Sequence, residues 1–322
     1  MNTCRICDTK ADHPIYYPRE MMYGTREEFE YFECTSCGCL QIKNIPTSIE
    51  KYYPSNYYSF SKGQTKKFQG LKGKIQTLKY KSRLFGNHPI HFLIRLLNSS
   101  NKYDMFGWLK LKYESRVLDV GCGNGMKFLY PLKEAGIFYS RGVDPFIKED
   151  IYYDNGLKIE KRNIFDLSEK FDLITYHHSF EHLENPLEHL IKVSDLLSQD
   201  GCCIIRIPTT SSWAWKKYGI NWFQLDAPRH FYLHSKKSLE ILADKAGLEI
   251  TKIIYDSTFK QFIESQKYQR NIPLNAPKER GFWNKIKYKY YRSKYNRSAS
   301  ILNALEKGDQ AAFFLKIKTD EK

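Results

Sequence analysis

The stretch VLDVGCGNG (residues 117–125) limits the fold of this chain more than any other segment. Its apolar start predicts a β-strand, and glycines at alternate positions let the backbone turn sharply and approach a ligand without a Cβ clash. The spacing is G-x-G-x-G, which differs from the G-x-G-x-x-G dinucleotide fingerprint. Asp144 follows about 20 residues after Gly123, at the end of the next predicted strand. A carboxylate there suits two ribose hydroxyls, so the two features together predict a Rossmann-like domain that binds a nucleoside.

Strand-like and helix-like segments alternate from Arg116 onward. Strands are expected within 115–125, 139–146, 157–167, 171–178, 202–208, 248–256 and 310–319, and helices within 126–136, 184–201 and 235–247. Ser235 is the expected N-cap of the last helix. This alternation predicts an α/β fold, with a doubly wound, seven-stranded and mostly parallel sheet covered by helices on both faces.

The first 50 residues contain two C-x-x-C pairs separated by 26 residues. The expected metal ligands are Cys4, Cys7, Cys34 and Cys37. Each pair fits a tight knuckle, and four thiolates make a closed tetrahedral Zn²⁺ site of the zinc-ribbon kind. The segment is too short to bury its own core, so structural zinc would supply the missing stability. Cys39 could compete with Cys37 as a ligand, and free buried cysteines are the alternative to a metal site.

The formal net charge of +15 is concentrated in two segments. Residues 61–112 hold 12 Lys and Arg against one acid, and residues 281–297 hold six Lys and Arg and no acid. Such localised basic surfaces predict an acidic partner, either phosphate, nucleic acid or anionic lipid. A basic face that only contacts solvent is the alternative. Within the first segment, residues 88–113 have helical periodicity.

The N-terminal residues and the cysteines indicate the expected cellular compartment. The opening MNTCRICDTK has no apolar signal core, and no apolar run reaches the roughly 18 residues of a membrane span. The cysteines are therefore expected to be reduced or metal-bound. We expect a cytoplasmic protein, with peripheral contact at the anionic inner face of the membrane as a further expectation.

From about residue 115 onward the chain resembles the class I S-adenosylmethionine (SAM)-dependent methyltransferases, on the stretches VLDVGCGNG, GVDP, NIFDL and FDLITYHHSFEHLENP. The resemblance implies that Asp119, Gly121 and Gly123 line the methionine end of SAM, that Asp144 holds the ribose and that residues 164–165 lie near the adenine. Residues 176–177 would border the methyl donor. The implied cofactor residues are Asp119, Gly121, Cys122, Gly123, Asp144, Ile164, Phe165, Tyr176 and His177. An NAD-binding Rossmann domain is the alternative for the glycine and aspartate set.

The segment His178–His182 spells H-x-x-E-H, the pattern of one class of zinc proteases. In those proteases the motif lies within one helix. Here it follows a predicted strand and precedes Pro186, which suits the first turn of a new helix. We therefore expect a strand-to-helix loop at the carboxyl edge of the sheet, where doubly wound folds bind ligands. No convincing third metal ligand lies nearby in the sequence.

The same letters resemble a methyltransferase segment, H-x-x-E-H-x-x-x-P, that closes the SAM pocket. The resemblance makes His178 a candidate base for an acceptor hydroxyl, and a loop histidine that holds backbone is the alternative. Glu181 and His182 are expected mainly to orient the loop. The catalytic candidates are His178, His182 and His230. Methyl transfer can also depend chiefly on alignment of donor and acceptor, without a strong base.

The stretch NWFQLDAPRHFYLHS (221–235) places aromatic residues beside paired polar groups, which suits stacking on a sugar ring and binding of its hydroxyls. The expected substrate contacts are Trp222, Asp226, Arg229 and Tyr232. The alternative is that these aromatics only cap the core. The stretch resembles methyltransferases of bacterial glycan and antibiotic-sugar pathways, in which D-x-P-R-H looks like a lid over the acceptor. The first 50 residues likewise resemble the zinc-binding leader of sugar methyltransferases.

These resemblances predict three parts: a zinc-binding module (1–50), a basic aromatic connector (51–114) and a methyltransferase domain (115–322) with an insertion at about 257–300. The expected reaction is SAM-dependent O-methylation of a sugar hydroxyl, on a nucleotide sugar or on a lipid-linked or surface glycan. The chain lacks the extra C-terminal domain of sugar C-methyltransferases, which favours O-methylation.

Two other function classes stay open. One is an RNA methyltransferase that binds RNA through the zinc module and the basic surface. Against it, the fourth strand is followed by Tyr-His-His-Ser instead of the Asn/Asp-Pro-Pro-aromatic motif of many base methyltransferases. The other is a non-catalytic SAM-fold binding or scaffold protein.

Overall fold

The computed structural model describes residues 1–53, 65–85, 111–277 and 281–319. Most of the helix expected over 88–113 lies outside these ranges. Statements below on absent features refer to the described residues.

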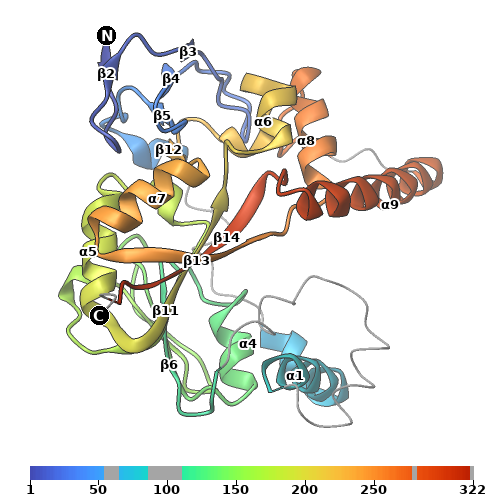
Figure 1. The fold of residues 1–322 in the computed structure, drawn as a ribbon. Coiled ribbons are helices and arrows are strands. Elements are labelled where there is room, and N and C mark those ends of the chain that lie inside the picture. Colours follow the sequence, from blue (N-terminus) through green and yellow to red (C-terminus); the bar gives the residue numbers. More distant parts are fainter. Residues whose placement is uncertain (54–64, 86–110, 278–280, 320–322) are drawn as a thin grey trace. The chain divides into compact units, whose positions relative to one another are not determined.

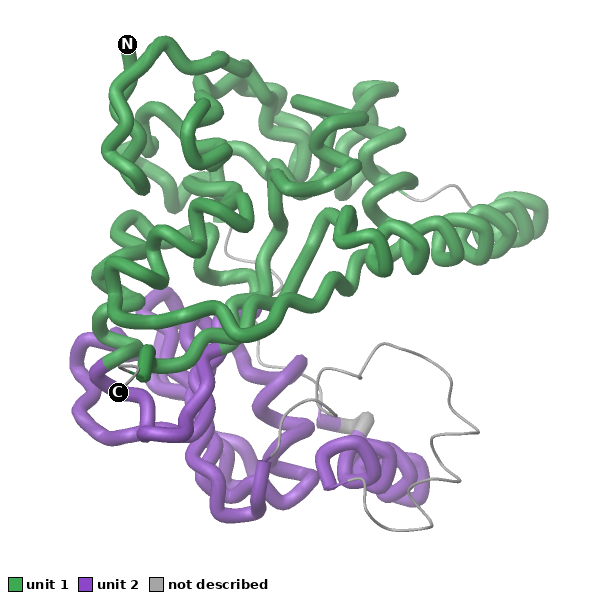
Figure 2. The backbone as a smooth tube through the Cα atoms, viewed as in Figure 1, with its two compact units in different colours: residues 1–54, 178–194, 204–322 green, residues 55–177, 195–203 purple. Residues whose placement is uncertain are grey.

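Contacts divide the chain into two compact units (Figure 2). Unit 1 comprises Met1–Pro54, His178–Ser194 and Ile204–Lys322, and unit 2 comprises Ser55–His177 and Asp195–Cys203. The units group segments that touch, so they do not follow the order of the sequence. The three-part division predicted above stays a prediction.

The main sheet of the described residues has eight strands in the order β13-β14-β11-β10-β6-β7-β9-β8. Figure 1 labels β6, β11, β13 and β14 among them. Its strands are β6 (Arg116–Val120), β7 (Tyr139–Val143), β8 (Ile151–Tyr152), β9 (Lys158–Glu160), β10 (Phe171–His177), β11 (Leu197–Pro208), β13 (Leu248–Tyr255) and β14 (Gln310–Ile317). β10, β6, β7 and β9 run parallel to one another, whereas β13 and β14 pair antiparallel. The expected α/β, Rossmann-like fold is confirmed.

The predicted number of seven strands was one too low. β8 pairs antiparallel with β9 through a tight turn, with Tyr153 N donating to Leu157 O at 3.0 Å. Gly156 lies in the turn with φ of 76°. The letters Asp-Asn-Gly before Leu157 are a hairpin signal that the sequence analysis did not use.

Unit 2 holds the strands that carry the glycine-rich turn. Its helices are the 3₁₀ segments η2 (Thr65–Phe68) and η4 (Ile164–Asp166) and the α-helices α1 (Gly70–Leu84) and α4 (Leu129–Glu134). Val117 and Leu118 of β6 and Ile174 of β10 have no exposed surface, and β6 is paired on both sides, with β10 and with β7. This buried strand fixes the point at which the glycine-rich turn begins.

Unit 1 carries most of the helices within the described residues. They are η1 (Ile49–Tyr52), η5 (Phe180–His182), α5 (Pro186–Leu196), α6 (Trp213–Tyr218), η6 (Gly219–Asn221), η7 (Phe223–Leu225), α7 (Lys236–Lys245), α8 (Lys260–Gln269) and α9 (Phe282–Ala304). Pro186 begins α5 and the Ser235 side chain accepts from the Ser238 amide, so both predicted helix starts are confirmed. α5 ends five residues before Gly201, earlier than predicted, because β11 begins at Leu197. None of the described helices is both long enough and apolar enough to cross a bilayer.

The cysteine-rich segment of unit 1 is built from short antiparallel strands. They are β1 (Asn2–Thr3), β2 (Lys10–Ala11), β3 (Ile15–Tyr16), β4 (Tyr31–Glu33) and β5 (Leu40–Ile42). β12 (Tyr232–Leu233), from far along the chain, pairs with β5 and completes a sheet of order β12-β5-β4-β3. The segment therefore shares a sheet with the end of the stretch 221–235.

Candidate functional site

In unit 2, the glycine-rich turn after β6 contacts the acid that follows β7. Gly121 and Gly123 have φ of 66° and 55°, a region that residues with side chains rarely adopt. The Gly123 amide donates to Asp144 Oδ2 at 2.8 Å, and the Phe146 amide donates to Asp144 Oδ1 at 2.9 Å. Two backbone amides thus hold this carboxylate in place at the end of β7.

Asp119 is the second acid of unit 2 and lies inside β6. Its carboxylate is buried and accepts a hydrogen bond from Thr175 Oγ1 at 2.8 Å. Burial, opposed by this hydrogen bond and reinforced by the charge of Asp144, raises the pKa of Asp119 to about 8. A nearby cation, such as the ammonium group of an amino acid, would favour the ionised form.

The loop of η4 combines a rigid backbone with an exposed aromatic ring. The Asn163 side chain accepts from the Phe165 amide, and the Asp166 side chain accepts from the Asn163 amide, which closes a capping box. Ile164 is buried and Phe165 is 42% exposed. The pair offers apolar surface of the kind that an adenine ring would contact.

The remaining predicted cofactor residues also lie in unit 2. Tyr176 is fully buried in β10, and the His177 ring lies 4.4 Å from the ring of Phe128, centroid to centroid. Cys122 is half-buried within the glycine-rich turn. All nine residues assigned to SAM belong to this one unit. Its two acids and apolar loop fit a ligand with a ribose, an ammonium group and a base.

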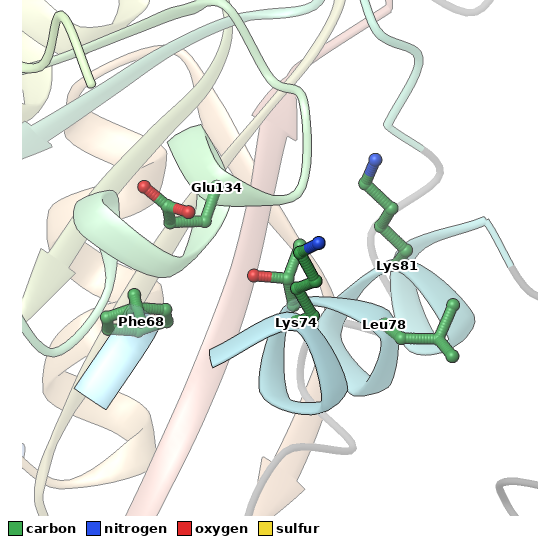
Figure 3. Close-up of a pocket in the computed structure, with 6 residues that line it drawn as sticks. Phe68, Lys74, Leu78, Lys81 and Glu134 are labelled. Carbon is green, nitrogen blue, oxygen red and sulfur yellow. The ribbon is translucent and has the colours of Figure 1, made fainter. Parts of the chain in front are cut away.

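A groove of about 310 Å³ in unit 2 lies away from this set (Figure 3). It is lined by Phe68, Lys74, Thr77, Leu78, Lys81 and Glu134. These residues come from η2, α1 and α4, and none of them is a predicted site residue. We assign it no role.

In unit 1, the H-x-x-E-H segment forms a loop, as predicted. β10 ends at His177, the short η5 spans Phe180–His182, and α5 begins at Pro186. The two motif histidines therefore do not share a face of one helix, which the protease arrangement requires. His178 itself has φ of 55°, an uncommon conformation for a residue with a side chain.

Glu181 lies at the centre of a cluster of imidazoles. His178 Nδ1 is 3.4 Å and His230 Nε2 is 3.9 Å from Glu181 Oε1. Glu181, His182 and His230 each offer one potential ligand atom, and these atoms all lie within 4.8 Å of one another. Burial would raise the pKa of Glu181, but the surrounding imidazoles outweigh it and lower this pKa to about 2. Burial lowers the pKa of His230 to about 4.

Hydrogen bonds fix the tautomers of these histidines. A carbonyl only accepts, so His182 Nδ1, 2.7 Å from Arg229 O, and His230 Nδ1, 2.8 Å from Gln224 O, both carry hydrogen. Both Nε2 atoms are then free to accept when the rings are neutral. His178 differs, because its Nε2 accepts from the Arg206 guanidinium at 2.7 Å. In this arrangement His178 has no free lone pair with which to take a proton.

The backbone that carries His230 is anchored by a buried guanidinium. Arg229 Nη2 lies 2.8 Å from Glu20 Oε1 and 2.6 Å from Asp226 Oδ1, and the Arg229 and Glu20 side chains are fully buried. Glu20 also accepts from the backbone amides of residues 22–25. Sequence reasoning missed Glu20, because nothing around it in the sequence indicates a partner 209 residues away.

The aromatic residues predicted to contact substrate are buried. Trp222 is 0% and Tyr232 is 1% exposed. Trp222 Nε1 donates to Asp309 Oδ2 at 3.1 Å, and the Tyr232 hydroxyl donates to Glu184 O at 3.1 Å. Trp222, Arg229 and Tyr232 are all buried, which favours the alternative that the aromatic residues only cap the core. Asp226, with a side chain 17% exposed, is the member of the predicted set that reaches the surface.

The four predicted thiol ligands come together in unit 1. The Sγ atoms of Cys4 and Cys37 are 3.6 Å apart, and those of Cys7 and Cys34 are 3.5 Å apart. All four lie within 4.8 Å of one another. A Zn–S bond of about 2.3 Å gives a tetrahedron with edges of about 3.8 Å, so a zinc ion fits this set. Cys39 lies outside it, with Sγ 4.0 Å from His234 Nδ1.

Comparison of sequences identifies one family. Residues 90–253, half of the chain, match the family described as "Methyltransferase domain". A comparison with curated proteins finds no match.

Solved structures give a distant resemblance. A SAM-dependent methyltransferase of Thermotoga maritima, described as a possible histamine N-methyltransferase, is 18% identical, covers 76% of this chain and 90% of its own, and has a TM-score of 0.41. A SAM-dependent methyltransferase of Archaeoglobus fulgidus is 20% identical over 71% of this chain and 99% of its own (TM-score 0.40). A cyclopropane synthase of Mycobacterium tuberculosis is 15% identical over 65% and 80% (TM-score 0.39).

Asp119→Asn is expected to stabilise the ligand-free protein while weakening its ligand site. Asn can still accept from Thr175 but carries no proton to lose. Because the pKa of Asp119 is raised in the folded state, the free energy of unfolding of the wild type falls as the pH rises from about 4 to about 8, by on the order of 1 kcal/mol per pH unit. The stability gap in favour of the variant should widen between pH 5 and pH 8 in thermal melts. A gap independent of pH would contradict this account of Asp119.

Cys4→Ser is expected to release one zinc ion per chain and to destabilise the cysteine-rich segment, because zinc binding there supplies folding free energy. Metal analysis of the purified protein measures the first effect, and proteolysis within residues 1–50 measures the second. Cys39→Ala is the matched control and should keep its zinc. Equal zinc content in Cys4→Ser and the wild type would rule out the thiol site.

Proposed function

The chain belongs to the methyltransferase-domain family and is a SAM-dependent methyltransferase, and from this premise we propose that its acceptor is a sugar hydroxyl. The sugar would be part of a nucleotide sugar or of a lipid-linked or surface glycan. Bound SAM supplies an electrophilic methyl group on a positively charged sulfur. The residues proposed to hold it are those of unit 2, with Asp144 at the ribose and Asp119 at the methionine end.

The single observation that carries the hydroxyl acceptor is the cluster around Glu181. In O-methylation the acceptor O–H bond breaks, its oxygen bonds to the methyl carbon, and the electron pair of the C–S bond stays with sulfur. An alcohol must therefore lose a proton, whereas a neutral amine already has a lone pair to attack with. A buried carboxylate with two imidazoles, whose potential ligand atoms all lie within 4.8 Å of one another, suits that need. We propose His182 and His230 as the groups nearest the acceptor.

His178 takes a supporting role in this proposal. Its Nε2 is occupied by Arg206, which in turn bonds Asp256 Oδ2 at 2.7 Å, and its Nδ1 faces Glu181. The side chain therefore positions Glu181 instead of meeting the acceptor. This revises the earlier expectation that His178 is the base.

Support for a sugar comes from the resemblance of 221–235 to glycan-pathway enzymes and from the acidic and imidazole groups themselves, which bind hydroxyls well.

α9 adds support for a phosphate-bearing carrier. It has no acid between 281 and 297, and Phe282 and Trp283 are 70% and 78% exposed. Basic and aromatic side chains together suit a pyrophosphate at an anionic membrane surface. We propose a cytoplasmic enzyme with this peripheral contact.

Transfer of tritiated methyl groups from SAM into a lysate of the source cell tests the acceptor class. We expect label that survives RNase and fractionates with nucleotide sugars or lipid-linked glycan. Label destroyed by RNase would contradict the proposal, and would make RNA the acceptor and the basic segments its binding surface.

Asp144→Ala tests the SAM site by calorimetric titration with SAM. Loss of the carboxylate that the Gly123 amide holds should weaken binding more than about tenfold, because two ribose hydroxyls lose their acceptor. Asp154→Ala, an exposed acid of the same unit, is the matched control and should bind normally. Near-normal binding by Asp144→Ala would refute the assignment.

A further inference from the structure

Glu181 is a buried carboxylate whose charge is not satisfied by hydrogen bonds. Its side chain is fully buried, and neither oxygen has a hydrogen-bond partner within the described residues. His178 Nδ1 lies 3.4 Å from Glu181 Oε1. A buried carboxylate without hydrogen bonds is unfavourable, and a bound cation would supply the missing partner.

The histidines beside Glu181 have the geometry of metal ligands. Ligating histidines usually donate the second ring N–H to a backbone carbonyl or a carboxylate, which fixes the ring and the tautomer. His182 does so to Arg229 O and His230 to Gln224 O, both through Nδ1. His230 Nε2, which keeps its lone pair, then lies 3.9 Å from Glu181 Oε1. That separation is too long for a hydrogen bond and short enough for two ligands of one ion.

The surrounding charges also favour a cation. Within the described residues, the acids that pair around the cluster are Glu181, Asp226 and Glu20, and Arg229 is the guanidinium that pairs with the last two. With neutral imidazoles the group carries two excess negative charges. Arg206 does not change this balance, because it is paired with Asp256. A divalent ion would neutralise the group.

Glu181, His182 and His230 are contributed by η5 and by the loop before β12, and their ligand atoms lie within 4.8 Å of one another. We propose that these three residues bind one divalent transition-metal ion, distinct from the zinc expected at the thiols. Two imidazoles and one carboxylate suit Mn²⁺, Fe²⁺, Co²⁺ or Zn²⁺ better than Mg²⁺ or Ca²⁺, which prefer oxygen ligands only. Three protein ligands leave open positions, as in catalytic sites.

The use of this site rests on the proposed function. Its open positions would take one or two adjacent hydroxyls of the sugar acceptor and lower the pKa of the hydroxyl that is methylated. The proton of that hydroxyl passes to water as its oxygen takes the methyl group. Asp226 is held by Arg229 through both oxygens, and His178 faces Glu181 through Nδ1, so these two orient the ligands.

Titration of the full-length protein with Mn²⁺ tests the proposal without SAM or acceptor. Free Mn²⁺ is followed by its electron paramagnetic resonance signal. Because thiolates select softer ions, the cysteine cluster with its zinc retained does not compete for Mn²⁺. We expect one Mn²⁺ per wild-type chain. Glu181→Gln and His230→Gln should each weaken binding about tenfold or more, since each removes one of three ligands.

Glu184→Gln is the matched control, because it makes the same change at an exposed position three residues away and should bind Mn²⁺ normally. Thermal melts check that each variant is folded, and His182→Gln, at a half-buried position, replaces any variant that is not. A wild type that binds none of Mn²⁺, Co²⁺ or added Zn²⁺ would overturn the proposal. Unchanged Mn²⁺ affinity in the folded ligand variants would do the same.

A second readout separates this proposal from the proposed function. If the wild type transfers methyl groups to glycan at full rate in EDTA, with its thiol-bound zinc retained, the metal site is refuted and the sugar acceptor stands. If Mn²⁺ binds as expected but the label enters RNA, the metal site is supported and the sugar acceptor is refuted.

Discussion

The ion pairs of the buried Arg229 guanidinium are the interaction on which the proposed acceptor side of this protein depends. The guanidinium joins Glu20, from the cysteine-rich segment, to Asp226, from the loop that carries His230. Removing one partner of such a pair typically costs about 3–5 kcal/mol, because the other charge is left buried and unpaired. Replacement of the whole set by apolar residues could be neutral for stability. The presence of these buried charges is therefore better explained by the geometry that they impose on the loop carrying His230 than by stability alone.

That geometry extends from the thiols to Glu181 through backbone contacts. The Cys37 carbonyl accepts from Ser235 Oγ, the Ile42 amide donates to Phe231 O at 3.0 Å, and the Phe231 amide donates to Glu181 O at 2.9 Å. The hydroxyl of Tyr31 donates to His230 O at 2.8 Å. A structural metal at the thiols would thus help to hold the acceptor-side cluster in place, although none of its ligands belongs to the cluster. The cysteine-rich segment would in this way contribute to the proposed acceptor site by holding it in place.

The sequence predicted those features of the fold and of the site that depend on local motifs and on periodic spacing. Gly121, Gly123 and Asp144 are separated by about one strand-helix-strand unit, so the parallel topology brings them together and their contact was foreseeable. The meeting of Glu181 with His230 was not, because it depends on a loop 49 residues later and on Arg229, whose partner lies near the N-terminus. Burial of Trp222 and Tyr232 could not be predicted from the sequence either, since aromatic residues are suited both to contact with a sugar ring and to packing in a core.

Methyl transfer by Glu20→Gln tests this account most directly, because Glu20 lies in the cysteine-rich segment and belongs to neither predicted ligand set. The measurement compares SAM affinity with the rate of label transfer to the glycan fraction, at a temperature where the variant is folded, with the exposed Glu28→Gln as control. The account predicts SAM affinity within about twofold of the wild type and transfer reduced about tenfold or more, as expected when acceptor-side positioning is lost. Normal transfer by folded Glu20→Gln would show that the ion pair with Arg229 does not position the acceptor site.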